Sequence, residues 1–184
     1  MSETKAISLT SQIYLKVDGA AVNEVVMANL IEVIVDQHTQ LPDMFMIRLH
    51  DPDLTFIDSE LFDLAKPIEI GSFKADGEPF SLLTGEITAL EPNFAASMVA
   101  ELLIRVYDQS HRLYREKKTA AFLNVRDSDL AEKIAKEASL DTEIELTEII
   151  YPHIYQHNQS DMAFLLSRAE RIGFECFVHD KQLH

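Results

Sequence analysis

Seven histidines and one cysteine are among the side chains of this sequence that could serve as metal ligands, bases or nucleophiles. His153 and His157 are four residues apart, the spacing that puts two zinc ligands on one face of a helix. Pro152 and the pair Ile154 and Tyr155 instead favour a loop or a strand. In a strand this spacing separates the two side chains by about 13 Å, too far for one zinc ion. The sequence therefore predicts no metal site.

Nucleophilic catalysis finds no support in the local motifs. Ser110 and His111 are neighbours in the sequence, which is not the geometry of a catalytic triad. Cys176 lies in an apolar run, where a small buried hydrophobic residue is expected. The sequence holds no G-x-S-x-G elbow, no P-loop and no G-x-G-x-x-G loop. We therefore predict no catalytic residue and no cofactor, and we do not expect an enzyme.

Composition excludes several classes of partner. Hydrophobic residues make up 47% of the 184 residues, which is enough for a packed core. The net charge of −15 argues against specific nucleic-acid binding and against an anionic membrane surface. Neither a signal peptide nor an apolar run of about 18 residues is visible. We expect a protein that is made in the cytoplasm and does not insert into a membrane.

The charge is unevenly distributed along the chain. Residues 1–104 carry 17 acidic and 5 basic side chains, whereas residues 105–118 carry 5 basic and 2 acidic ones. This short basic segment is either a solvated loop or edge strand, or a contact with an acidic neighbour. The candidate partner-contact residues are Arg112, Arg115, Lys117 and Lys118.

The first 118 residues show the alternation of half-buried strands. Apolar residues recur at every second position in 13–17, 31–35 and 45–49. Asp18-Gly19 and Asp76-Gly77 predict hairpin turns, and Glu91-Pro92-Asn93 predicts a further turn. A short helix is expected after Ser59, and a last long strand over 98–107. About six strands with hairpin turns predict an antiparallel barrel or sandwich.

The pattern changes to helical spacing near residue 119. Apolar residues on one face predict helices over 127–140 and 160–172. Asp127 or Ser128 is expected to cap the first helix, Asn158 or Ser160 the second, and Gly173 to end it. Strands are predicted over 143–150 and 174–178, and a hairpin with its tip at residues 180–181. Because the sequence stops inside that hairpin, we expect a fragment of a longer protein.

Three pieces of the last third resemble one known family in their order. They are YDQSHRL at 107–113, the stretch from FLN at 122–124 through SDL at 128–130, and QHNQSD at 156–161 followed by RIG at 171–173. The sequence is similar here to the phage late-control protein D and VgrG-type spike family. These are baseplate hub proteins of contractile tails and injection systems.

The resemblance implies a mainly β fold with an α+β part. Residues 1–118 would form an antiparallel β-barrel similar to a tail-tube subunit, and residues 119–184 a small α/β domain truncated at its C-terminus. The full-length protein would be a homotrimer that adapts the sixfold tail tube to a threefold spike. Its partners would be the tail-tube protein, baseplate proteins and the spike tip, in a phage tail, a type VI secretion system or an extracellular injection particle. The protein would be assembled in the cytoplasm and become part of that particle.

A second function remains open at this point. A β-domain followed by a small two-helix unit could instead be a cell-surface module that binds glycan or peptidoglycan. Exposed aromatic side chains would favour it, and Tyr151 and Tyr155 are the candidates.

Overall fold

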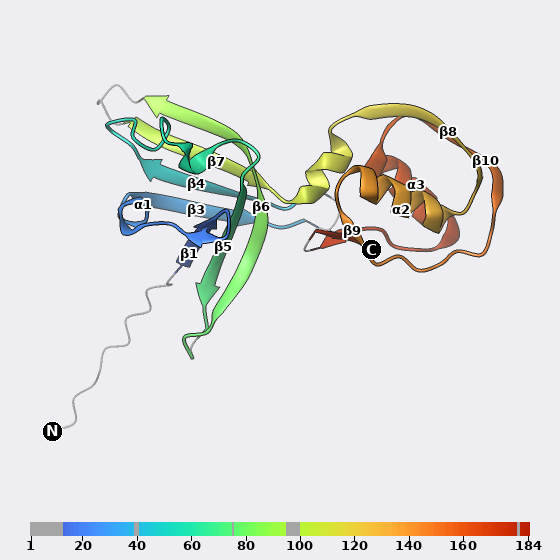
Figure 1. Cartoon of the computed structure of the whole chain (residues 1–184), viewed down its shortest axis with the longest axis horizontal. Helices are drawn as coiled ribbons and strands as arrows, with labels where there is room; N and C mark the ends of the chain where they lie inside the picture. The colour runs from blue at the N-terminus through green and yellow to red at the C-terminus, as the bar shows by residue number, and fades with distance from the viewer. Residues whose placement is uncertain (1–12, 39–40, 75, 95–99, 180) are drawn as a thin grey trace. The chain divides into compact units, whose positions relative to one another are not determined.

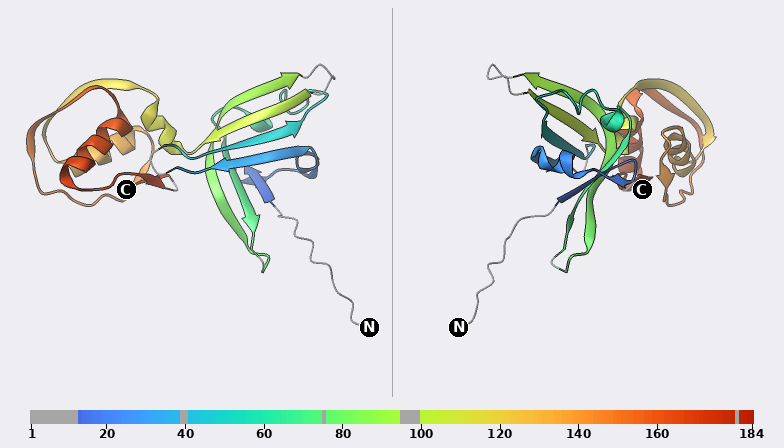
Figure 2. Two further views of the ribbon diagram at one scale, coloured as in Figure 1. Left: turned by 180° about the vertical axis from the view of Figure 1, so that it is seen from behind. Right: turned by 60° about the vertical axis from the view of Figure 1, so that its left-hand side comes forward.

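The computed structural model describes residues 13–38, 41–74, 76–94, 100–179 and 181–184 (Figure 1 and Figure 2). The chain divides into two compact units. The first comprises residues 1–34 and 46–106, and the second comprises residues 35–45 and 107–184. The boundary predicted between residues 118 and 119 lies inside the second unit, and as a domain boundary it remains a prediction.

A seven-stranded sheet dominates the first unit (Figure 1). Hydrogen bonds join its strands in the order β2-β1-β5-β6-β7-β4-β3. Since the two end strands are not paired with each other, the described strands form an open sheet and not a closed barrel. The predicted mainly antiparallel β fold is confirmed, with β1 antiparallel to β2 and β5, and β5 antiparallel to β6. The strands are β1 Ile13–Val17, β2 Ala20–Ala21, β3 Leu30–Asp36, β4 Met44–His50, β5 Pro67–Phe73, β6 Pro79–Phe94 and β7 Ala100–Tyr107.

Alternating burial along these strands builds the core. In β4 the side chains of Phe45, Ile47 and Leu49 are fully buried while their neighbours are half exposed. The same alternation runs through β7, where Leu102 and Ile104 are buried. Such a period of two is what a sheet with one covered face requires.

The predicted Asp18-Gly19 turn is confirmed by the positive φ angles of both residues, 51° and 78°, the conformation of a type I′ hairpin.

One element was not predicted, and two local predictions need correction. A short helix, α1 Glu24–Ala28, is capped by the Asn23 side chain, which accepts a hydrogen bond from Val26 N at 3.0 Å. The turn expected at residues 91–93 is absent, because β6 continues through it to Phe94. Glu91 pairs with Arg105 of β7 at 2.5 Å, which helps to hold this stretch extended. The helix expected after Ser59 is a single 3-10 turn, η1 Glu60–Phe62. Of the strand expected over 98–107, residues 98–99 lie outside the described residues.

The second unit holds two helices inside a ribbon of two strands. In Figure 1 and Figure 2, α2 and α3 lie side by side and β8 and β10 curve around them. Strands β8 and β10 are antiparallel, with an irregularity between Gln156 and Gln159. A small sheet joins β11 and β12 as a hairpin, with β9 parallel to β12. The elements are η2 Gln109–Tyr114, β8 Lys117–Val125, α2 Asp127–Glu137, β9 Asp141–Thr142, β10 Tyr151–Ser160, α3 Asp161–Ile172, β11 Val178–His179 and β12 Gln182–Leu183.

Both helices were predicted. The capping residues of α3 were identified correctly, whereas the N-cap of α2 was not. Ser160 caps α3 by accepting a hydrogen bond from Ala163 N, and Gly173 ends it with φ 73°, as predicted. Helix α2 begins at Asp127, but its N-cap is Arg126 and not Asp127 or Ser128. The carboxylate of Asp129 accepts a hydrogen bond from Arg126 N at 3.3 Å instead.

The strand prediction over 143–150 was wrong. This segment has no regular secondary structure, and the neighbouring residues 151–160 form β10 instead. The strand predicted over 174–178 is confined to residues 178–179, as β11. The predicted C-terminal hairpin is present as β11 and β12, although residue 180 of its tip lies outside the described residues.

Candidate partner-contact site

The four predicted contact residues lie on η2 and at the start of β8. The carboxylate of Asp108 opens η2 by accepting hydrogen bonds from Ser110 N at 3.1 Å and from Ser110 Oγ at 2.5 Å. Leu113 is buried in the core of the second unit and anchors η2 there. The basic side chains are therefore carried on a segment whose backbone is fixed at both ends.

Two of the four basic side chains, Arg112 and Lys118, contact residues of α2 and α3. Arg112 donates to the carbonyl oxygen of Ala138, at the end of α2, at 2.8 Å. Lys118 is 2.6 Å from a carboxylate oxygen of Asp161 and 3.7 Å from one of Glu137. The hydrogen bond from Lys118 to Asp161 raises the pKa of Lys118, so this lysine stays charged in the neutral range. Both side chains therefore have a structural role.

The other two are more exposed. Arg115 projects from the end of η2, where its guanidinium contacts Nε2 of His111. Lys117 is exposed and forms no ion pair with any residue that the structure describes. Arg112, Arg115 and Lys118 line one depression of about 260 Å³, and Lys117 is not among its lining residues. That these residues contact a partner remains a prediction, and Arg115 and Lys117 are the two best placed for it.

Acidic side chains that the sequence analysis did not single out compensate the positive charge of this depression. Glu116, Glu137 and Asp161 line it together with the basic residues. Asp161 is buried and also accepts a hydrogen bond from Gln156 Nε2 at 3.0 Å. The sequence showed Asp161 only as part of a helix start, since nothing in its spacing connects it with Lys118.

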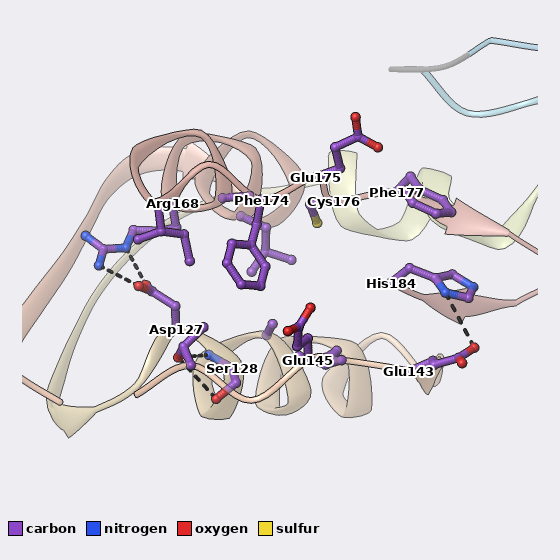
Figure 3. Close-up of a pocket in the computed structure, with 16 residues that line it drawn as sticks. Asp127, Ser128, Glu143, Glu145, Arg168, Phe174, Glu175, Cys176, Phe177 and His184 are labelled. Carbon is purple, nitrogen blue, oxygen red and sulfur yellow. Dashed lines mark hydrogen bonds and ion pairs between the residues drawn. The ribbon is translucent and has the colours of Figure 1, made fainter. Parts of the chain in front are cut away.

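A second depression, which we call the acidic–aromatic pocket, lies between α2, α3 and the segments 143–147 and 174–177 (Figure 3). Its volume is about 280 Å³. One end is closed by an ion pair in which Arg168 Nε lies 2.6 Å from Asp127 Oδ1 and its Nη2 lies 3.1 Å from Oδ2. The Arg168 guanidinium also lies over the Tyr151 ring, 4.6 Å from its centroid. Burial alone would lower the pKa of Arg168, but the Asp127 carboxylate outweighs it and raises that pKa.

Aromatic rings and carboxylates surround the open part of this pocket. Figure 3 shows the Phe174 ring inside the pocket, with Glu145 across from it, whereas the Glu175 carboxylate points away from the pocket. Phe174 and Phe177 are 40% and 41% exposed. The Phe177 ring stacks on the His184 ring at 4.9 Å, and Nδ1 of His184 lies 3.6 Å from a carboxylate oxygen of Glu143.

The side chains considered as nucleophile or base, Cys176, Ser110 and His111, are not arranged for catalysis. Burial raises the pKa of Cys176 to about 11, so its thiol is protonated and weakly nucleophilic at neutral pH. Ser110 Oγ bonds Asp108, while Nδ1 of His111 lies 2.6 Å from the Asp108 carbonyl oxygen. The serine and the histidine therefore do not form a nucleophile–base pair with each other.

His153 and His157 lie on β10 with the Tyr155 ring between theirs, at 6.2 and 5.7 Å. In the part of the chain that the structure describes, no three His, Cys, Asp or Glu side chains are arranged to hold a metal ion. Likewise, none of the described helices is long and apolar enough to cross a membrane.

Of the two tyrosines named as a possible glycan platform, one is exposed. Tyr155 is 52% exposed, whereas Tyr151 is half-buried beneath Arg168. The Tyr155 ring is nearly parallel to the two histidine rings beside it, at interplanar angles of 17° and 19°. Its faces are thus turned toward these rings, which disfavours the flat open surface that stacking on a sugar requires.

Comparison with known proteins gives a family and a fold. Residues 8–184 match the family model of the Alg8 N-terminal domain, which differs from the late-control D and VgrG families that the sequence resembles. No curated protein matches the sequence.

Three solved structures illustrate the likeness of fold. The 43 kDa tail protein of prophage MuSo2 from Shewanella oneidensis matches with a TM-score of 0.67 and 13% identity, over 95% of this chain and 53% of that one. An E. coli component of the type VI secretion system, described as similar in structure to T4 bacteriophage tail proteins, matches with a TM-score of 0.56 and 18% identity, over 84% and 43%. A chain of the Francisella PdpA–VgrG complex matches with a TM-score of 0.61 and 12% identity, over 96% and 31%. This chain thus spans between about a third and about half of the length of the tail and secretion proteins whose fold it shares.

Proposed function

Because this chain belongs to the Alg8 N-terminal domain family and has the fold of phage tail and injection-system proteins, we propose that it is a structural component of a contractile tail or a tail-like injection system. The observation that carries the proposal is the likeness of fold over 95% of the chain to a prophage tail protein. Within such a particle, its role would be that of a baseplate hub or spike component that adapts the sixfold tube to a threefold spike.

The partners follow from that role as further proposals. They are two more copies of the full-length protein, the tail-tube protein, baseplate proteins and the spike tip. The protein would be made in the cytoplasm and carried in the finished particle. We assign it no catalytic step, since the Cys176 thiol is protonated at neutral pH and Ser110 and His111 each contact Asp108.

The basic segment supplies a physical reason for a specific contact. In a chain of net charge −15, the exposed Arg115 and Lys117 form a local site at which an acidic neighbour can approach. Arg112 and Lys118 hold this segment against α2 and α3 through Ala138 and Asp161. A fixed backbone lowers the entropy lost when the exposed side chains are bound.

The test is co-expression of the chain with tail-tube and baseplate proteins from the same genome, followed by affinity purification and electron microscopy. We expect a tail protein to co-purify with the wild type, and the double variant Arg115→Glu/Lys117→Glu to retain less than about a tenth of it. The matched control is Lys74→Glu/Lys136→Glu, which reverses two exposed charges elsewhere and should bind like the wild type.

The two parts of the proposal fail separately. If no tail or baseplate protein binds the wild-type chain, the structural role is rejected. If binding occurs and the Arg115→Glu/Lys117→Glu variant retains it in full, the role stands and the basic segment is rejected as the contact.

A further inference from the structure

The acidic–aromatic pocket has a chemistry that the proposed function does not use. Its lining combines apolar side chains, among them Ala131, Leu165 and Ile172, with carboxylates around its opening. We infer that this pocket binds one arginine or lysine side chain, presented by an apolar–basic peptide segment of a partner protein. The inference concerns the second unit alone and does not depend on the role in a tail.

The volume of the pocket suits one long side chain. At about 280 Å³ it lies just below the range of about 300–1,000 Å³ that is usual for whole small molecules and cofactors. A long side chain with an apolar stem and a charged end fits such a volume. The stem would lie along Leu165 and Ile172, and the charged end would lie among the polar groups of the opening.

The ion pairs within the pocket show which of its carboxylates are free to bind a cation. Asp127 is neutralised by Arg168, and Glu143 lies beside His184. Glu145 and Glu175 are exposed and form no ion pair with any residue in the described part of the chain. Glu145 can therefore accept a charge-assisted hydrogen bond from a guanidinium or an ammonium group in the pocket, and Glu175 adds negative charge beside it.

The rings of Phe174 and Phe177 add a second attraction for a cation. Both are about two-fifths exposed and line the pocket. An aromatic face attracts a cation that lies within about 6 Å of its centroid. One face of Phe177 is covered by His184, so the Phe174 ring together with the unpaired Glu145 carboxylate favours a basic occupant over a neutral apolar one.

Charge also decides between a partner and a second copy of this chain. Each copy carries a net charge of −15, so long-range electrostatics favours a basic partner over a second copy as the occupant of this pocket. Arg112 and Lys118 of a second copy are, in addition, held by Ala138 and Asp161.

The experiment is a nuclear magnetic resonance titration of the whole chain with the peptide acetyl-Ala-Leu-Arg-Leu-Ala-amide. We expect saturable shifts at Phe174, Phe177 and Cys176, and an affinity that falls as salt is added. The same peptide with citrulline in place of arginine keeps the shape and lacks the charge, and it should bind at least about tenfold more weakly.

Two variants with equal loss of charge assign the effect to the pocket. Glu145→Gln/Glu175→Gln should weaken binding of the arginine peptide at least about tenfold. Glu132→Gln/Glu148→Gln removes two exposed carboxylates that do not line the pocket, and it should leave the affinity unchanged.

Three results would overturn the inference. The first is no saturable shift at the pocket at millimolar peptide. The second is equal affinity for the arginine and citrulline peptides, or equal loss in the two variants. The third is a concentration-dependent shift at the pocket without peptide that Arg115→Glu removes, because the occupant would then be a second copy.

Discussion

The ion pair of Asp127 and Arg168 is the most consequential pair of side chains in the second unit. Its two members are only 8% and 9% exposed, and they join the first turn of α2 to the middle of α3. Each charge has been removed from water, so each depends on the other for compensation. Breaking such a pair leaves an unpaired buried charge, which costs more than the pair itself contributes.

We therefore predict that Asp127→Asn lowers the stability of the second unit by about 3 kcal/mol. Hydrogen exchange of the α2 and α3 amides measures this as a lower free energy of opening. Glu132→Gln, which removes the exposed partner of Lys136, should change it by less than about 0.5 kcal/mol. Equal exchange in Asp127→Asn and wild type would show that the pair is not structural.

In the first unit, Glu69 receives two cross-strand partners from β1. Tyr14 donates a hydrogen bond to it at 2.7 Å, and Lys16 lies 3.2 Å away. Burial by itself would raise the pKa of Glu69, but the hydrogen bonds from Tyr14 and Lys16 outweigh it and lower that pKa. The pKa of Tyr14 rises to about 12, through burial and through its bond to Glu69.

A lowered carboxyl pKa means that ionised Glu69 stabilises the folded state. This contribution is present above the unfolded-state pKa of about 4.3 and is lost as the pH falls through the lower folded-state pKa. Glu69→Gln should therefore lower the free energy of unfolding by about 1 kcal/mol at pH 7 and by almost nothing near pH 3. Urea unfolding at a series of pH values measures the difference. The exposed Glu78→Gln should show no such pH dependence, and a constant deficit for Glu69→Gln would contradict the assignment.

Among the elements, α3 shows how a single capping side chain defines a helix. Ser160 Oγ accepts a hydrogen bond from Ala163 N at 3.3 Å, which satisfies one of the unpaired N–H groups of the first turn. Ser167, in the same helix, instead donates to the Phe164 carbonyl oxygen at 2.8 Å. That carbonyl already lies within the helical hydrogen-bond pattern.

Ser160→Ala should cost about 1 kcal/mol, seen as faster hydrogen exchange in the first turn of α3. Ser167→Ala makes the same chemical change in the same helix and should be nearly neutral. If both variants exchange alike, the capping role of Ser160 is wrong.

The sequence predicted the elements whose limits are set by residues within the element itself. The helices were found because apolar spacing, Ser160 and Gly173 all indicate the same limits. Residues 143–150 alternate like a strand, but a strand exists only where another chain segment pairs with it, and β8 pairs with residues 151–160 instead. Pairing between segments far apart in sequence cannot be read from either segment alone.

At the scale of the whole molecule, a resemblance of short motifs and a count of strands were enough for the fold class. The strand order was not predicted, since an open sheet and a closed barrel share the same alternation within each strand. Local charge located the basic segment, but the partner of Lys118, Asp161, lies 43 residues along the chain. The acidic–aromatic pocket was missed because its lining residues come from several separate segments.

The low reactivity of the Cys176 thiol makes site-specific labelling of this protein straightforward. It is the only cysteine of the chain, it is partly covered, and its thiol is held protonated at neutral pH. A maleimide or disulfide reagent therefore reacts faster with a cysteine introduced on the surface than with the native one. A dye, spin label or cross-linker can therefore be attached to a single introduced cysteine while the native Cys176 is kept in place.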